Sequence, residues 1–179
     1  MFREAASDLG TLWGRQAGRD PAVTVRDLLT LLDADGYGTC EHLLASCGKA
    51  LGKPGAAMLR STLLARLHDL PASKAKGDYL TDIGRMQTLG HLKDLADAMG
   101  DVDAYIEAVS LSDRQFASIG DVARRLLDKE RAHEALEWLD RETDETSRFR
   151  WENDDLRIEA CEAVEDRDQA QSLRWKVFR

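Results

Sequence analysis

The stretch that most constrains the fold of this chain runs from Asp121 to Arg141, where two short helical patterns meet at a polar turn. The apolar residues of each pattern recur three and four positions apart, which places them on one face of a helix. These residues are Val122, Ala123, Leu126 and Leu127, followed by Ala132, Ala135, Leu136 and Leu139. The turn at 128–130 is long enough only to fold the second helix back on the first. Because such a pair cannot bury both apolar faces alone, it needs neighbouring helices.

Similar turns occur before and after this pair, and an alanine follows each of them. Ala104, Ala135 and Ala170 each lie a few residues into the returning helix, at spacings of 31 and 35 residues. These spacings are close to the tetratricopeptide period of about 34 residues, and a small side chain lets the two helices approach closely. The sequence therefore predicts an all-α fold in which antiparallel helix pairs stack as a tetratricopeptide-like α-solenoid. Residues 1–179 are expected to form a single helical-repeat domain.

The composition supports a helical fold. Among 179 residues there are only three prolines, and 43% are hydrophobic and 32% charged, which indicates a folded domain rather than disorder. β-branched residues are few, so a sheet would lack its usual material. We expect about ten helices. One should start at Thr24, as a capping box with Asp27, and another at Pro54. A bend or brief interruption is expected near Gly90, and a long polar loop from Arg141 to Trp151.

The net charge of −8 at pH 7 argues against a nucleic-acid partner, because phosphate binding needs a basic surface. It also argues against an anionic membrane surface, and no stretch approaches the ~20 apolar residues of a membrane span. The first residues, MFREAASDLG, contain acids and no apolar run, which is not the pattern of a signal peptide. The three cysteines show no CxxC spacing. We therefore expect a location in the reducing cytoplasm.

The stretch Asp33-Ala-Asp-Gly-Tyr-Gly resembles the start of a calcium-binding EF-hand loop. Counted from Asp33, however, Tyr37 stands at the fifth position and Leu44 at the twelfth, where calcium needs oxygen ligands. The two missing ligands favour a glycine-containing turn, in which Asp33 or Asp35 hydrogen-bonds the local backbone.

Cysteine and histidine could in principle bind a metal. The spacing of Cys40, His42 and Cys47 matches no zinc pattern, and helical geometry points Cys40 and His42 in different directions. Cys47 lies at helical spacing from two leucines and is expected in the core. The sequence therefore predicts no metal and no other cofactor.

The remaining histidines, His68, His91 and His133, are isolated along the chain and are expected on turns or at the surface. None has a nearby Ser, Cys or Asp in the arrangement of a catalytic triad, although triad residues need not be close in sequence. The sequence therefore identifies no catalytic residue.

Several stretches resemble one group of bacterial proteins. They are Asp35-Gly-Tyr-Gly-Thr-Cys-Glu-His-Leu-Leu with Ala50-Leu-Gly, Met99-Gly-Asp-Val-Asp-Ala-Tyr-Ile, Ala135-Leu-Glu-Trp-Leu-Asp, and Asp155-Leu-Arg-Ile-Glu-Ala with Gln169-Ala-Gln-Ser-Leu-Arg-Trp. From about Asp20 to the C-terminus, the chain is similar to a proteobacterial domain family of unknown function. The resemblance implies tetratricopeptide-like helices and supplies no activity and no catalytic residues. Members of the family are usually longer, so we expect a fragment or a trimmed member whose last helix is an exposed end.

The candidate partner-binding residues lie in the C-terminal half: Trp138, Arg148, Arg150, Trp151 and Trp175. The two arginines belong to a segment rich in carboxylates, which is either a solvated loop or a charged rim facing a ligand. Trp138 lies beside the core residues of its helix, so packing is the alternative to binding. An exposed Trp151 or Trp175 in a groove would anchor a partner.

These observations favour a protein- or peptide-binding scaffold without catalytic activity, with its partner in a concave groove. The alternative is a small-molecule binder or an enzyme whose Asp, Glu and Arg side chains meet across helices. Self-association through the last helix, Arg167–Phe178, is a third alternative.

Overall fold

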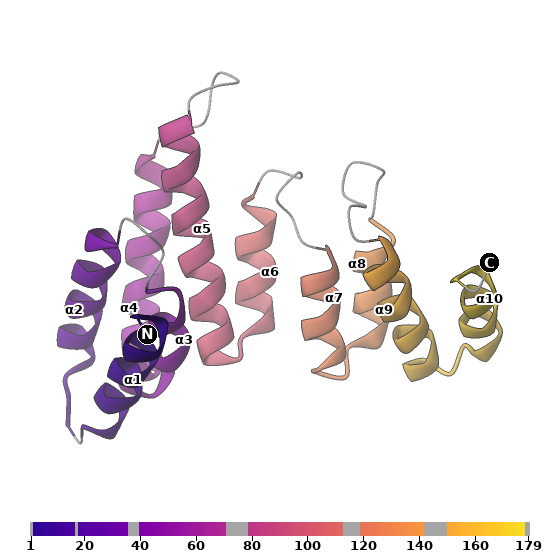
Figure 1. Cartoon of the computed structure of the whole chain (residues 1–179), viewed down its shortest axis with the longest axis horizontal. Coiled ribbons are helices and arrows are strands. Elements are labelled where there is room, and N and C mark those ends of the chain that lie inside the picture. Colours follow the sequence, from indigo (N-terminus) through magenta and orange to yellow (C-terminus); the bar gives the residue numbers. More distant parts are fainter. Residues whose placement is uncertain are drawn as a thin grey trace. The chain divides into compact units, whose positions relative to one another are not determined.

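The computed structural model describes residues 2–16, 18–35, 40–70, 79–112, 119–141 and 150–177. Within these ranges the chain forms ten helices and no strand (Figure 1), which confirms the prediction of an all-α fold. No helix in these ranges combines the length and the apolar character needed to cross a bilayer. The chain divides into two compact units, residues 1–108 and 109–179. The predicted single domain over residues 1–179 and the predicted stacking of its helices as a solenoid stay predictions.

The first unit is organised around the long helices α4 and α5, which lie side by side (Figure 1). Its helices are α1 (Phe2–Arg15), α2 (Pro21–Ala34), α3 (Glu41–Ser46), α4 (Gly48–Asp69), α5 (Tyr79–Met99) and α6 (Val102–Ser110). Helix α4 packs against α2 and α5, and α1 packs against α3 and α4. The core is built mainly from leucines of α2 to α5, which recur at helical spacing. They are Leu28, Leu32, Leu43, Leu44, Leu51, Leu59, Leu63, Leu67, Leu89, Leu92 and Leu95.

Helix α2 begins at Pro21, so the predicted start at Thr24 is wrong. The Asp20 carboxylate accepts a hydrogen bond from the Ala22 N–H at 2.9 Å, and Pro21 takes the first helical position. An aspartate cap followed by proline is a favourable helix start. Thr24 lies inside the helix and is fully buried, and its hydroxyl accepts a hydrogen bond from Arg19 Nε at 2.9 Å.

Glycines break one of the two long helices and leave the other intact. Gly52 has a φ of +55° and interrupts α4, and the helix resumes with Pro54 in its first turn, as predicted. Helix α5 is continuous from Tyr79 to Met99, so the interruption predicted near Gly90 is wrong. The glycine costs α5 only about 1 kcal/mol, and the buried leucines on either side of it keep the helix packed in the core.

The second unit contains the helix pair from which the sequence predictions began. Its helices are α7 (Ile119–Leu127), α8 (Ala132–Leu139), α9 (Arg150–Ala163) and α10 (Arg167–Val177). Helices α7 and α8 fold back on each other, and both pack against α9. Helix α10 packs against α9. One buried residue among those described is polar, Asn153. The buried apolar residues of these four helices are Ile119, Val122, Ala123, Leu126, Ala132, Ala135, Leu139, Leu156, Ala160, Cys161 and Ala170.

The turns after α5, α7 and α9 share one hydrogen-bond pattern. Each contains a residue with positive φ: Gly100 at 65°, Glu130 at 60° and Glu165 at 62°. The N–H of the following residue donates to the carbonyl five residues earlier, at 2.9 Å in all three turns. This is the Schellman motif, which satisfies the last carbonyls of a helix and reverses the chain.

These turns correct the alignment of the three alanines. Five residues after each positive-φ position lie Tyr105, Ala135 and Ala170, all buried. Ala104 is therefore one residue out of register. At the equivalent position, the first turn has a tyrosine and the other two turns have an alanine. The sequence alignment matched alanine with alanine and therefore missed this one-residue shift. The backbone conformation of the turn, and not the residue type, determines which residue faces the preceding helix.

Candidate functional site

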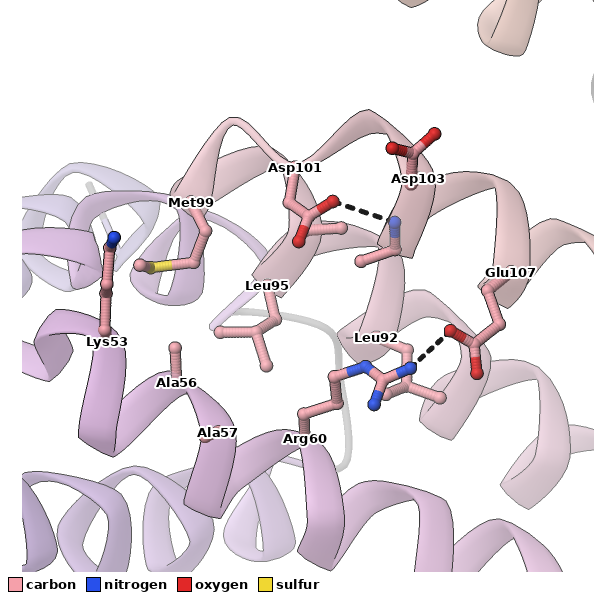
Figure 2. Close-up of a pocket in the computed structure, with 12 residues that line it drawn as sticks. Lys53, Ala56, Ala57, Arg60, Leu92, Leu95, Met99, Asp101, Asp103 and Glu107 are labelled. Carbon is pink, nitrogen blue, oxygen red and sulfur yellow. Dashed lines mark hydrogen bonds and ion pairs between the residues drawn. The ribbon is translucent and has the colours of Figure 1, made fainter.

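A cleft of about 560 Å³ lies between α4, α5 and α6 of the first unit (Figure 2). Leu92, Leu95 and Ala96 of α5 form its floor and are at most 6% exposed. Ala56 and Ala57 of α4 flank this floor, and their short side chains leave space above it. The volume falls within the ~300–1,000 Å³ typical of ligand-binding pockets. The cleft therefore offers an apolar floor with open space above it.

Charged side chains surround the apolar floor. Lys53 and Arg60 extend from α4, while Asp103 and Glu107 extend from α6 (Figure 2). Arg60 and Glu107 form an ion pair that joins the two helices. Their side chains are 40% and 52% exposed, so the pair contributes at most about 1 kcal/mol to stability. Its effect on the site is to neutralise one charge on each side of the cleft.

The remaining charges of the rim are unequally distributed. Asp101 caps α6, because its Oδ1 accepts a hydrogen bond from the Ala104 N–H at 3.0 Å (Figure 2). Asp101 and Asp103 are both exposed at the N-terminal end of α6, where the helix dipole favours negative charge. On the α4 side, Lys53 forms no ion pair with any residue that the structure describes. The α6 side of the cleft is therefore acidic.

A second pocket, of about 510 Å³, lies between α2, α4 and α5 in the same unit. The Arg66 guanidinium donates to both carboxylate oxygens of Asp33, at 2.6 and 2.9 Å, and joins α4 to α2. Asp35, Thr88 and His91 also line this pocket. The pocket thus brings Asp33 of α2 and Arg66 of α4 together with His91 of α5.

His91 departs from the sequence prediction. His68 and His133 are exposed, as expected, but His91 lies within α5 and is half-buried, so its predicted position on a turn or at the surface is wrong. Burial lowers the pKa of His91 below 6.5, and the nearby Arg66 lowers it further, while Asp33 and Asp35 act in the opposite direction. The imidazole is consequently neutral at pH 7.

The five predicted binding residues all fall within residues 109–179, the second unit, whereas the residues that line the two pockets belong to the first. Trp138 of α8 is half-buried, and the Arg141 guanidinium lies over its ring at 4.2 Å from the ring centroid. Trp175 of α10 is 62% exposed. Arg148 lies outside the described residues, and so do the side chains of Arg150 and Trp151, the first residues of α9. Trp138 therefore has a cation–π partner in its own chain, whereas Trp175 remains accessible.

The structure confirms that Asp35 hydrogen-bonds the local backbone and that Cys47 lies in the core, while the glycines of the predicted turn lie outside the described residues. Asp35 Oδ2 accepts a hydrogen bond from the Cys40 N–H at 2.6 Å, while residues 36–39 lie outside the described ranges. Cys47 is fully buried, and burial raises the pKa of its thiol to about 11 against a smaller opposing effect of Arg19. Across the described residues, no three His, Cys, Asp or Glu side chains are grouped as a metal site would need.

The cleft residues were missed because their pattern resembles an ordinary solvated helix face. Lys53, Ala56, Ala57 and Arg60 follow the spacing i, i+3, i+4, i+7, as a single helix face does. Two alanines between two cations could have indicated a shallow site, but the leucines of α4 mark the opposite face as the core. Nothing in the sequence shows that α6 lies across from this face.

The model of a family described as a family of unknown function (DUF6880) matches residues 1–179. No curated protein matches the chain. No solved structure matches it either.

Proposed function

The chain belongs to this family of unknown function, and we propose that it is a protein- or peptide-binding helical-repeat module. The observation that carries the proposal is the α4–α6 cleft, in which buried leucines form a floor and charges are confined to the rim. Interfaces place an apolar anchor in a desolvated centre and polar contacts at the periphery, and the cleft has this arrangement. The three shared helix turns, and the packing of α9 on both α7 and α8, support the tetratricopeptide-like arrangement.

The cleft also favours a particular partner chemistry. Its floor suits an aromatic or large aliphatic side chain, which contributes about 1.5–3 kcal/mol when it is fully buried. Asp101 and Asp103 on the α6 side favour a lysine or arginine beside that anchor. We therefore expect a segment with an apolar anchor and an adjacent basic residue. We place the protein in a reducing cytoplasm, where its cysteines are not oxidised to disulfides.

Selection from a displayed library of random peptides tests this proposal with the full chain as the target. We expect enrichment of peptides that carry an aromatic or leucine residue next to Lys or Arg. In the variant Ala57→Arg the arginine fills the cleft, and binding of the enriched peptides should fall at least about tenfold, equivalent to 1.4 kcal/mol. The matched control is Ala65→Arg, which makes the same change at an exposed position of α4 outside the cleft.

The Ala65→Arg variant should bind the enriched peptides as the unmodified chain does, and both variants should retain the helical circular-dichroism signal. The absence of any enriched motif would overturn the proposal. Equal binding by Ala57→Arg and the unmodified chain would place the binding surface elsewhere and would also overturn it.

The second candidate function is binding of a small molecule in the pocket between α2, α4 and α5. The observation that favours it is the neutral, half-buried His91 beside the Asp33–Arg66 pair. Because its pKa is lowered in the folded state, His91 contributes stability that is present above pH 6.5 and is lost as the pH falls through its folded-state pKa. The pocket is thus expected to retain its structure at neutral pH and to weaken in acid.

An NMR titration of the His91 ring protons, assigned with His91→Gln, checks both statements. Without ligand the midpoint should lie below 6.5. An anionic compound that binds beside the ring should raise this midpoint, because it favours the imidazolium. If no member of a panel of small carboxylates, phosphates and amines moves the His91 resonances, the second candidate fails.

A further inference from the structure

Helix α10 presents an exposed aromatic residue within a basic stretch. Trp175 is 62% exposed and is followed by Lys176, which forms no ion pair with any described residue. Arg174, on the other side of Trp175, is paired with Glu162 of α9. The helix carries three basic residues and one acidic residue, in a chain whose net charge is −8. A single exposed hydrophobic residue is common on protein surfaces, but tryptophan is enriched among the residues that anchor interfaces.

The attachment of α10 leaves this side chain free to contact another molecule. Helix α10 packs against α9, and Ala170 is its only buried residue among those described. The exposed Trp175 retains apolar surface whose burial against another molecule would be favourable. Its neighbours on the helix are polar or charged, so the apolar contact that it offers is local.

The α4–α6 cleft matches this helix in chemistry. The cleft has an apolar floor large enough for a side chain, and Asp101 and Asp103 lie on its acidic side. Trp175 supplies an aromatic anchor, and Lys176 supplies an adjacent positive charge. This is the partner chemistry argued above for the cleft, so the following inference rests on the proposed function.

We propose that the chain associates with a second copy of itself, in which Trp175 of one copy occupies the α4–α6 cleft of the other and Lys176 faces Asp101 and Asp103. The two surfaces in contact differ, so the interface is heterologous and continues from copy to copy. A single helix in a cleft buries less area than the ~1,200 Å² of a stable interface. The association is therefore weak and depends on concentration.

Sedimentation of the full chain from about 1 μM to about 1 mM, the range of weak complexes, measures this association. We expect the mean mass to rise above that of one chain as the concentration increases. Trp175→Ala and Ala57→Arg should each remain monomeric over this range, whereas the control Ala65→Arg should associate as the unmodified chain does. Both altered side chains are exposed, so the helical circular-dichroism signal should not change.

Mixing the two monomeric variants gives the sharpest test. Trp175→Ala keeps an intact cleft, and Ala57→Arg keeps an intact α10, so one interface remains between them. The mixture should form one-to-one dimers and nothing larger. A chain that is monomeric up to about 1 mM, or association that persists in both single variants, would overturn the inference. If the chain is monomeric but peptides are enriched on it, the inference fails and the proposed function is retained. If the peptide selection fails, the proposed function fails and the self-association loses the argument on which it rests.

Discussion

Replacing Leu59 with alanine lowers the free energy of unfolding by about 2 to 5 kcal/mol. Leu59 is fully buried in α4, the helix that packs against both α2 and α5. Truncation removes its apolar contacts with the leucine core and leaves a cavity, because the surrounding helices cannot close completely around the smaller side chain. Urea denaturation followed by circular dichroism measures the loss, and hydrogen exchange of the α4 and α5 amides shows whether it lies in the first unit.

The matched control is the preceding residue in the same helix. Met58 is 46% exposed, so Met58→Ala should change the free energy of unfolding by no more than about 0.5 kcal/mol. Both substitutions introduce the same residue into the same helical turn, and helix propensity cannot account for a difference between them. Similar losses in the two variants would show that Leu59 is not in the core.

Replacing Gly48 with alanine should destabilise the chain by about 1 to 3 kcal/mol. A Cβ at Gly48 would lie 2.5 Å from the carbonyl oxygen of Ala98, closer than real Cβ contacts come. The obstacle is backbone, which cannot rotate away, so the start of α4 must move from the end of α5. Gly48 does not have a positive φ, and the effect therefore comes from the contact and not from backbone strain. Chemical denaturation measures it.

Gly90→Ala provides a control of opposite sign. A Cβ at Gly90 would meet no atom within 4 Å, and this residue lies in the interior of the continuous helix α5. Alanine should therefore raise the free energy of unfolding by about 0.5 to 1 kcal/mol, through its higher helix propensity. If Gly48→Ala raised the free energy of unfolding as Gly90→Ala is expected to do, the close approach of α4 and α5 at Gly48 would be wrong.

Local patterns predicted the elements better than they predicted their contacts. The helical spacing in α7 and α8 and the helix start at Pro54 were confirmed, because helix periodicity and glycine conformation act over a few residues. The errors arose where a local signal was overridden, either by a second local signal or by packing in the core. Asp20 caps α2 in place of Thr24, and packing in the core keeps α5 helical through Gly90.

The candidate site was not predictable from the sequence. The tryptophans and arginines of the C-terminal half were chosen for their residue type, whereas the cleft is lined by alanines, leucines and ordinary surface charges. Lys53 and Glu107 line the same cleft only because one face of α4 packs close to α5 and α6. His91 likewise gained its lowered pKa from helices distant in sequence.

From the sequence alone it follows that this chain is helical and that it turns back at residues 128–130. These properties follow from periodicity, turn chemistry and composition, which are local or additive. Only the tertiary structure decided which helix faces meet, and hence that an apolar cleft lies between α4, α5 and α6. The physical reason is that an amphipathic helix specifies which of its faces is buried but not which neighbour buries it.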